Sequence, residues 1–138
     1  MDKNTHDMLE KKLLMQILYQ LPKNSILAFP KPSYFDDCKA SKLLEKFRIQ
    51  DSFSKDIIIP DYYYLIGDKS RSTYIEQIAN TDLLTYLCHF MIYSKCDQKI
   101  IISVMVYDNC VFCLSDEIII EQEFMEQCED AGLHIQKL

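Results

Sequence analysis

Cys110 and Cys113, in the stretch Cys-Val-Phe-Cys, have the spacing of a redox or zinc-binding motif. A redox pair places its first cysteine at the N-terminus of a helix, which stabilises the thiolate. Here both cysteines fall in an apolar run typical of a strand, where positions three apart point to opposite faces. The remaining candidate zinc ligands, Cys96, Cys128 and His134, are scattered single residues. We therefore predict no metal site, no thiol chemistry and no cofactor.

The sequence contains no GxSxG or HExxH motif for hydrolysis. Lys69 and Ser70 follow Gly67, but a phosphate-binding loop needs the pattern GxxxxGK[ST], and this stretch has only one glycine. His89 lies among apolar residues without an acidic or cysteine ligand at a suitable spacing, which favours a hydrogen-bonded core histidine over a catalytic base. We therefore predict that the protein is not an enzyme.

Three consecutive tyrosines, Tyr62, Tyr63 and Tyr64, support an alternative function. In a strand Tyr63 points away from its two neighbours, so at least one ring is expected to reach the surface. Packing with a hydroxyl at the rim is the favoured interpretation, and stacking on a base or a sugar is the functional one. The alternative prediction is a small cytosolic enzyme or ligand-binding domain with a pocket near Tyr62–Tyr64 and His89.

Carboxylates in the last 39 residues are the strongest chemical signal in the chain. The net charge is −6, and residues 100–138 contain eight acidic side chains and one basic side chain, whereas residues 1–99 contain 13 acidic and 14 basic side chains. No Lys or Arg lies between Lys99 and Lys137. These carboxylates therefore need counter-charges from water, from distant basic residues or from a partner.

A helix from Ser115 or Asp116 to about Asp130, ended by Gly132, is expected to carry these carboxylates. Acidic residues at its C-terminal end oppose the helix dipole by about 0.3 to 1 kcal/mol each, which favours a positively charged partner. Its inner face is expected to hold Ile120, Phe124, Cys128 and Ala131. The residues that we predict to bind the partner are Asp116, Ile119, Gln122, Glu123, Glu126, Glu129 and Asp130.

Residues 99–114 should form the hairpin that positions this helix. Residues 99–107 are almost all apolar, as in a central strand, and Asp108-Asn109 is a turn that returns the chain antiparallel over residues 110–114. Residues 133–138 can add a short strand. We expect a single globular α+β domain over residues 1–138, with a small antiparallel sheet built around the 99–114 hairpin and packed against three to four helices.

Apolar spacing and capping residues predict the other elements. Residues 81–94 fit a buried helix, although residues 86–93 are also rich in β-forming side chains; we choose the helix. The earlier helices are expected near residues 5–21, 36–47 and from Thr73 onward, and the earlier strands at residues 25–29, 57–59 and 62–66.

Composition leaves a non-catalytic binding protein as the best hypothesis. No run approaches the roughly 18 apolar residues of a membrane span, the N-terminus lacks a secretory signal, and the negative charge opposes nucleic-acid binding, so we expect a cytoplasmic protein. An immunity or antitoxin-type inhibitor from a bacterium would use the acidic helix to mask a basic surface of a toxin, for example a nuclease. The sequence leaves the oligomeric state open.

Overall fold

The computed structural model describes residues 3–31, 35–53, 59–66, 72–81, 87, 89–106 and 110–138. Its α-helices are α1 (Lys3–Tyr19), α2 (Lys39–Leu44), α3 (Ser72–Ala79) and α5 (Gln122–Asp130). Its strands are β1 (Ser25–Phe29), β2 (Arg48–Ile49), β3 (Tyr62–Leu65), β4 (His89–Ser94), β5 (Ile100–Val106), β6 (Cys110–Leu114) and β7 (Leu133–Lys137). Within these ranges the chain is α+β, as predicted.

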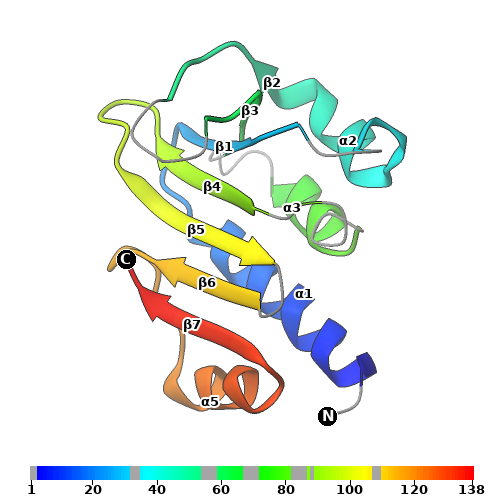
Figure 1. Cartoon of the computed structure of the whole chain (residues 1–138), viewed down its shortest axis with the longest axis vertical. Helices are drawn as coiled ribbons and strands as arrows, with labels where there is room; N and C mark the ends of the chain where they lie inside the picture. The colour runs from blue at the N-terminus through cyan, green and yellow to red at the C-terminus, as the bar shows by residue number, and fades with distance from the viewer. Residues whose placement is uncertain are drawn as a thin grey trace.

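All seven strands belong to one sheet in the order β2-β3-β1-β4-β5-β6-β7 (Figure 1). Neighbouring strands are antiparallel except β6 and β7, which are parallel. The predicted hairpin is confirmed, because β6 returns antiparallel along β5; its turn at residues 108–109 lies outside the described residues. The prediction of a small sheet built around that hairpin is wrong, since four further strands extend it on the β4 side.

Strand β4 is the main reason why the sheet is larger than expected. We predicted a helix over residues 81–94, but His89–Ser94 is a strand between β1 and β5, and residues 82–86 and 88 lie outside the described residues. Five of its six residues are buried on the two faces of the sheet. A strand buried on both faces shows no alternation of apolar and polar residues, so periodicity cannot distinguish it from a buried helix.

One face of the sheet is covered by the helices, and the main core lies between this face and the helices. In Figure 1 α1 runs behind the sheet and α5 lies along β7. The core contains inward-facing strand residues such as Phe90, Val104 and Phe112 together with residues of the four described α-helices, for example Leu13 of α1 and Cys128 of α5. This arrangement gives a sheet and a helical layer around one hydrophobic core.

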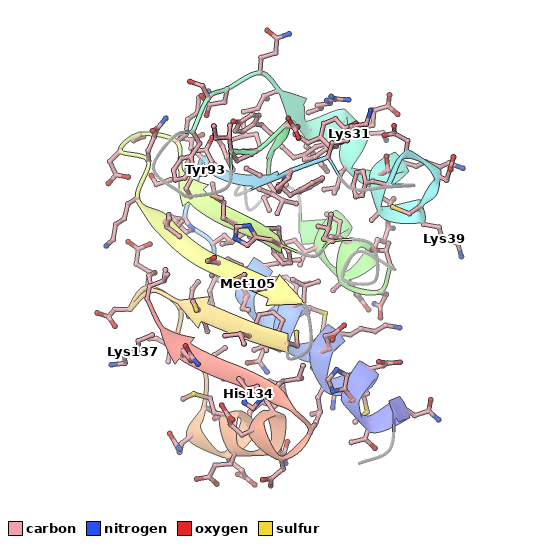
Figure 2. The ribbon with its side chains drawn as sticks, viewed as in Figure 1. Lys31, Lys39, Tyr93, Met105, His134 and Lys137 are labelled. Carbon is pink, nitrogen blue, oxygen red and sulfur yellow. The ribbon has the colours of Figure 1, made fainter. Side chains whose placement is uncertain are left out.

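The opposite face of the sheet is covered at one end and open at the other. Phe53 stacks on Tyr93 over the β3-β1-β4 end, with ring centroids 4.4 Å apart. Towards β7, Met105 is exposed and His134 is only partly buried; Figure 2 labels both. The predicted opposition of the two cysteines is confirmed, because Cys110 is buried in the main core while Cys113 faces the open side.

The earlier helices form close to their predicted positions. The core side of α1 is buried as expected, except for Met8, which is 49% exposed. The helix expected over residues 36–47 is divided into α2 and two flanking 3-10 turns, Phe35–Asp37 and Glu45–Phe47. Strand β3 confirms the strand predicted at residues 62–66, whereas Ile59 is exposed and in no strand and residues 57–58 lie outside the described residues.

The acidic helix is shorter than predicted. α5 begins at Gln122, not at Ser115 or Asp116, because residues 115–121 form turns and extended backbone in which Ile118 and Ile120 are buried. Three consecutive β-branched isoleucines favour such extended backbone over helix. The predicted end is confirmed, since Gly132 has a φ of +87° and β7 starts directly after it.

Gly132 offers a test of this helix ending. A Cβ at residue 132 would meet no atom within 4 Å, so the cost of Gly132→Ala is the left-handed backbone alone. We expect Gly132→Ala to lower the free energy of unfolding by about 1 to 2 kcal/mol and Gly132→Asn to lower it less, because asparagine tolerates this conformation. Urea unfolding measures both; equal losses for the two variants would contradict this account.

Candidate partner-binding surface

The chain from β6 to β7, residues 115–132, is called the crossover here, and it holds every residue predicted to bind a partner. Because β6 and β7 are parallel, the chain must run back from the end of β6 to the level of its first residue before β7 can begin. Such a connection requires a dozen or more residues. α5 occupies the second half of the crossover. Asp116 and Ile119 therefore precede the helix instead of lying on its face, while Gln122, Glu126 and Asp130 lie on α5.

Helix α1 holds the crossover at both ends. The side chain of Gln20, directly after α1, accepts a hydrogen bond from Ile119 N–H (2.7 Å) and donates one to Ile119 C=O (2.9 Å). Near the start of α1, His6 Nδ1 lies 2.7 Å from the Ala131 carbonyl, which makes this nitrogen the donor. The two contacts link positions 99 and 125 residues apart, and neither has a signal in the local sequence.

Gln20 fixes Ile119 in an outward position. Ile118 and Ile120 are 7% and 8% exposed, whereas Ile119 between them is 76% exposed. Two hydrogen bonds from one side-chain amide leave the backbone of Ile119 little freedom. An exposed, branched apolar side chain on a fixed backbone is a suitable contact residue, because little conformational entropy is lost when a partner binds it.

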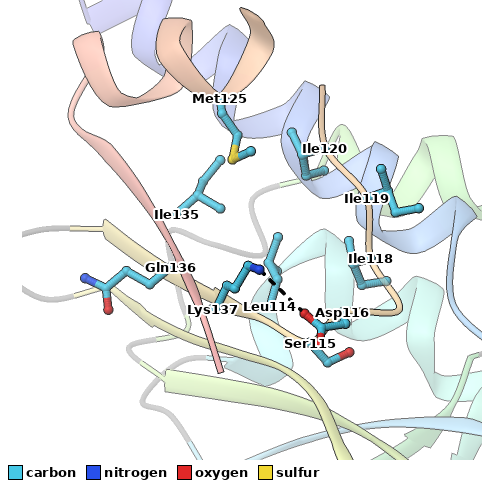
Figure 3. A pocket seen from close by; sticks show the side chains of 10 residues that line it. All are labelled: Leu114, Ser115, Asp116, Ile118, Ile119, Ile120, Met125, Ile135, Gln136 and Lys137. Atoms are coloured by element: carbon cyan, nitrogen blue, oxygen red, sulfur yellow. Dashed lines mark ion pairs between the residues drawn. The ribbon is translucent and has the colours of Figure 1, made fainter. Parts of the chain in front are cut away.

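An apolar hollow of about 300 Å³ lies beside Ile119. Its walls come from β6, the first half of the crossover, α5 and β7, as Figure 3 shows. Most of the wall is apolar, and its apolar residues are Leu114, Ile118, Ile119, Ile120, Met125 and Ile135. The sequence prediction missed this hollow because it placed Ile118 to Ile120 on a helix and did not predict that β7 would lie parallel to β6.

Two carboxylates before α5 have lysine partners at the two ends of the acidic stretch. Asp116 Oδ1 lies 4.0 Å from Lys137 Nζ, and Glu117 Oε1 lies 3.7 Å from Lys99 Nζ. All four side chains are well exposed, so these pairs contribute little to stability. For Asp116 and Glu117 the counter-charge therefore comes from basic residues distant in the sequence, one of the three sources that the sequence left open.

Four carboxylates on and before α5 remain exposed without a cationic partner in the described part of the chain: Glu121, Glu123, Glu126 and Asp130. Glu126 accepts only a long hydrogen bond from Gln122, at 3.4 Å. The prediction did not include Glu121, which immediately precedes α5. Three of the four were predicted as binding residues and are available for contact.

Glu129 was predicted to bind a partner, but its carboxylate already has two contacts within the chain. Oε2 lies 3.0 Å from His134 Nδ1, and Oε1 accepts a hydrogen bond of 3.0 Å from Ile135 N–H. The hydrogen bond from Ile135 N–H is the main cause that holds the pKa of Glu129 below its ordinary value, and the contact with His134 is the second cause. These contacts offset the unfavourable position of Glu129 at the C-terminal end of α5.

The residues of the alternative prediction lie apart. Tyr62, Tyr63 and Tyr64 are all less than 10% exposed, so the expectation that one ring reaches the surface is wrong. Their alternation is confirmed: Tyr62 and Tyr64 lie in the main core, whereas Tyr63 lies on the opposite face. His89 is on β4, separated from β3 by β1, and its Nε2 lies 3.3 Å from Ser103 Oγ.

A polar hollow of about 770 Å³ near β2 and β3 includes Tyr63, Arg48 and Asp51 in its wall but not His89. The Asp51 carboxylate accepts a hydrogen bond of 2.7 Å from the Tyr93 hydroxyl. Beside this hollow, the Arg48 guanidinium lies 4.4 Å from the ring centroid of Tyr62. Asp51 and Arg48 are thus each in contact with a tyrosine, and the enzymatic alternative stays a prediction.

Two thiols of the main core, those of Cys110 and Cys128, are poor nucleophiles. Burial raises the pKa of Cys110 to about 12 and that of Cys128 to about 11. Because the thiolate is the reactive form, both side chains act as small apolar groups at neutral pH.

Comparison with known proteins finds no matching family model and no significant match among curated proteins or solved structures. In the described part of the chain, no helix is long and apolar enough to span a membrane. The candidate function therefore depends on the chemistry of this surface alone.

Gln20→Ala tests how the crossover is held. Without the Gln20 amide, the backbone N–H of Ile119 loses its acceptor, and we expect its hydrogen exchange to accelerate by at least about tenfold and the free energy of unfolding to fall by about 1 kcal/mol. Gln16→Ala, four residues earlier in α1, is the matched control, since only the backbone of Gln16 receives a bond from Gln20. Similar exchange at Ile119 in both variants would contradict the role of Gln20.

Glu129→Gln tests the carboxylate at the β7 edge. Because the folded pKa of Glu129 is lowered, its stabilising contribution is complete above the pKa of an unfolded glutamate and is lost as the pH falls through the folded pKa. The carboxylate is about half exposed, so we expect a loss of less than about 1 kcal/mol at pH 7 and a smaller loss at pH 2.5. Urea unfolding at both pH values measures this, with Glu123→Gln as the control; a loss independent of pH would contradict it.

Proposed function

We propose that the protein is a non-catalytic binding protein that masks a basic surface of another protein with its crossover. The observation that carries the proposal is the group of exposed carboxylates Glu121, Glu123, Glu126 and Asp130, which have no cationic partner in the described part of the chain. Like charges gathered on one short segment repel one another, and a basic partner relieves that repulsion on binding.

Opposite charge would act mainly on the rate of association. A surface of one sign steers a partner of the other sign and raises the association rate above the ordinary 10⁵ to 10⁶ M⁻¹s⁻¹ by about ten- to a thousandfold at low salt. Specific affinity then needs an apolar centre, because exposed ion pairs contribute little. The exposed Ile119, next to the carboxylates, is suited to that second role.

An acidic surface suits a partner that has a dense basic surface. Nucleases bind phosphates through clusters of Lys and Arg, and an acidic surface competes directly with those phosphates. We therefore propose an immunity or antitoxin-type inhibitor, which acts in the bacterial cytoplasm on a toxin such as a nuclease. Such an inhibitor needs a stable scaffold and a charged face, and it needs no catalytic group.

Charge reversal tests this proposal. We expect Glu123→Lys, Glu126→Lys and Asp130→Lys together to abolish salt-sensitive co-purification of basic proteins from a lysate of the source organism, and to slow association with the purified partner at least about tenfold. The control is Asp37→Lys, Glu45→Lys and Glu76→Lys, which changes the net charge equally at other exposed positions.

The control variant should retain the partner, and the retained partner should lose its toxic activity when mixed with the wild-type protein. Circular dichroism verifies that both triple variants stay folded. Equal retention by the two variants would contradict the proposal, and so would a partner whose surface is acidic.

A further inference from the structure

We infer that the apolar hollow beside Ile119 is an anchor socket, which takes one large apolar side chain flanked by Lys or Arg on a segment of the partner protein. The inference rests on the proposed function and specifies the chemistry of the partner.

The size and lining of the hollow favour a side chain over a cofactor. Small-molecule sites in proteins are usually about 300 to 1,000 Å³ and surround most of their ligand. This hollow, at about 300 Å³, is at the lower limit of that range, and Met125, Ile135 and Leu114 give it an apolar wall. In Figure 3 those three residues surround the space, with Asp116 and Lys137 at one side. One inserted aromatic or aliphatic side chain suits such a site.

The edge of β7 disfavours a partner strand as the occupant. Leu138 N–H donates to Leu114 C=O. Backbone groups alternate between the two sides of a strand, so the even-numbered residues along β7 direct theirs towards β6. Odd-numbered Ile135 therefore directs its N–H outward, where the Glu129 carboxylate already accepts it. A strand added to this edge would have to displace a charged acceptor, whereas a side chain can enter the hollow without breaking that bond.

Charge decides between a second copy of the chain and a basic partner. Residues 115–130 contain seven carboxylates and no Lys or Arg. Of these carboxylates, Asp116 lines the hollow beside Lys137, and the others lie on the surface around it. Two copies that met through this face would bring these groups together, and like charges at an interface cost affinity. Lysines or arginines beside the inserted side chain meet opposite charge instead, for instance at Glu121, which is exposed without a partner in the described ranges.

Ile119 and Gln20 give the socket a preformed rim. Gln20 bonds both backbone groups of Ile119, so the isoleucine side chain is held outward before any partner arrives. Contact residues of this kind often dominate the binding energy when a ring of less important polar residues excludes water around them. We assign the dominant contact at this rim to Ile119 and the positioning role to Gln20.

A set of short peptides tests the inference. Each probe has the form Lys-Lys-X-Lys-Lys, with X phenylalanine, leucine, methionine, serine or glycine, and binding is measured by fluorescence polarisation. We expect the wild-type protein to bind the three apolar probes about tenfold more tightly than the serine and glycine probes. Probes with glutamate in place of lysine should not bind.

Two variants separate this inference from the proposed function. Ile119→Ser should remove the preference for apolar X and leave the affinity for the serine probe unchanged. The triple reversal Glu123→Lys, Glu126→Lys and Asp130→Lys should weaken all lysine probes alike. Both changes are at exposed positions, so the fold is expected to persist.

Three results would overturn the inference. If the wild-type protein binds every lysine probe equally, the hollow does not bind the apolar side chain, whereas the proposed binding by the acidic surface is retained. If no lysine probe binds at all, both the inference and the proposed function fail. If sedimentation shows a dimer that Ile119→Ser dissociates, the occupant of the hollow is a second copy of the chain.

Discussion

The parallel pairing of β6 and β7 is the constraint on which the candidate surface depends. Consecutive antiparallel strands can be joined by a two-residue turn, as proposed for β5 and β6, but a parallel neighbour requires the chain to cross the sheet first. The crossover that results contains α5, the apolar hollow and most of the acidic excess. α1 then fixes the crossover through Gln20 near its first half and His6 near its end. The longest helix of the described chain thus acts as the support of the surface, while the sheet supplies its base.

The carboxylates of the crossover differ in their contacts and therefore in their roles. Glu129 is structural, since it completes the hydrogen bonding of the β7 edge and contacts His134. Asp116 and Glu117 form exposed pairs with lysines, which solvent screens strongly. Glu121, Glu123, Glu126 and Asp130 have neither kind of contact in the ranges that the structure describes. A small domain tolerates such a cluster because each exposed like charge lowers the free energy of unfolding only slightly. A basic partner can replace this repulsion by attraction on binding.

The sequence predicts local features of this fold well and long-range ones poorly. The β6 strand, the glycine that ends α5 and the opposite orientation of Cys110 and Cys113 follow from turn chemistry and strand alternation. Strand β4 was missed because burial on both faces removes its periodicity. The start of α5 was misplaced because Asp116 resembles a helix cap, whereas packing of Ile118 and Ile120 into the core keeps that segment extended. The acidic residues were visible in the sequence, but the hollow and the bond from Gln20 to Ile119 arise only when segments about a hundred residues apart meet.

The central claim is that the crossover binds a basic partner through its carboxylates and Ile119. Chemical-shift mapping tests it most directly: the isotope-labelled protein is titrated with the peptide Lys-Lys-Phe-Lys-Lys, and every backbone amide is followed. The account predicts that the largest changes fall within residues 115–138 and near Gln20, and that they disappear in Ile119→Ser. Changes centred on the polar hollow around Arg48 and Tyr63, or spread evenly over the chain, would contradict it.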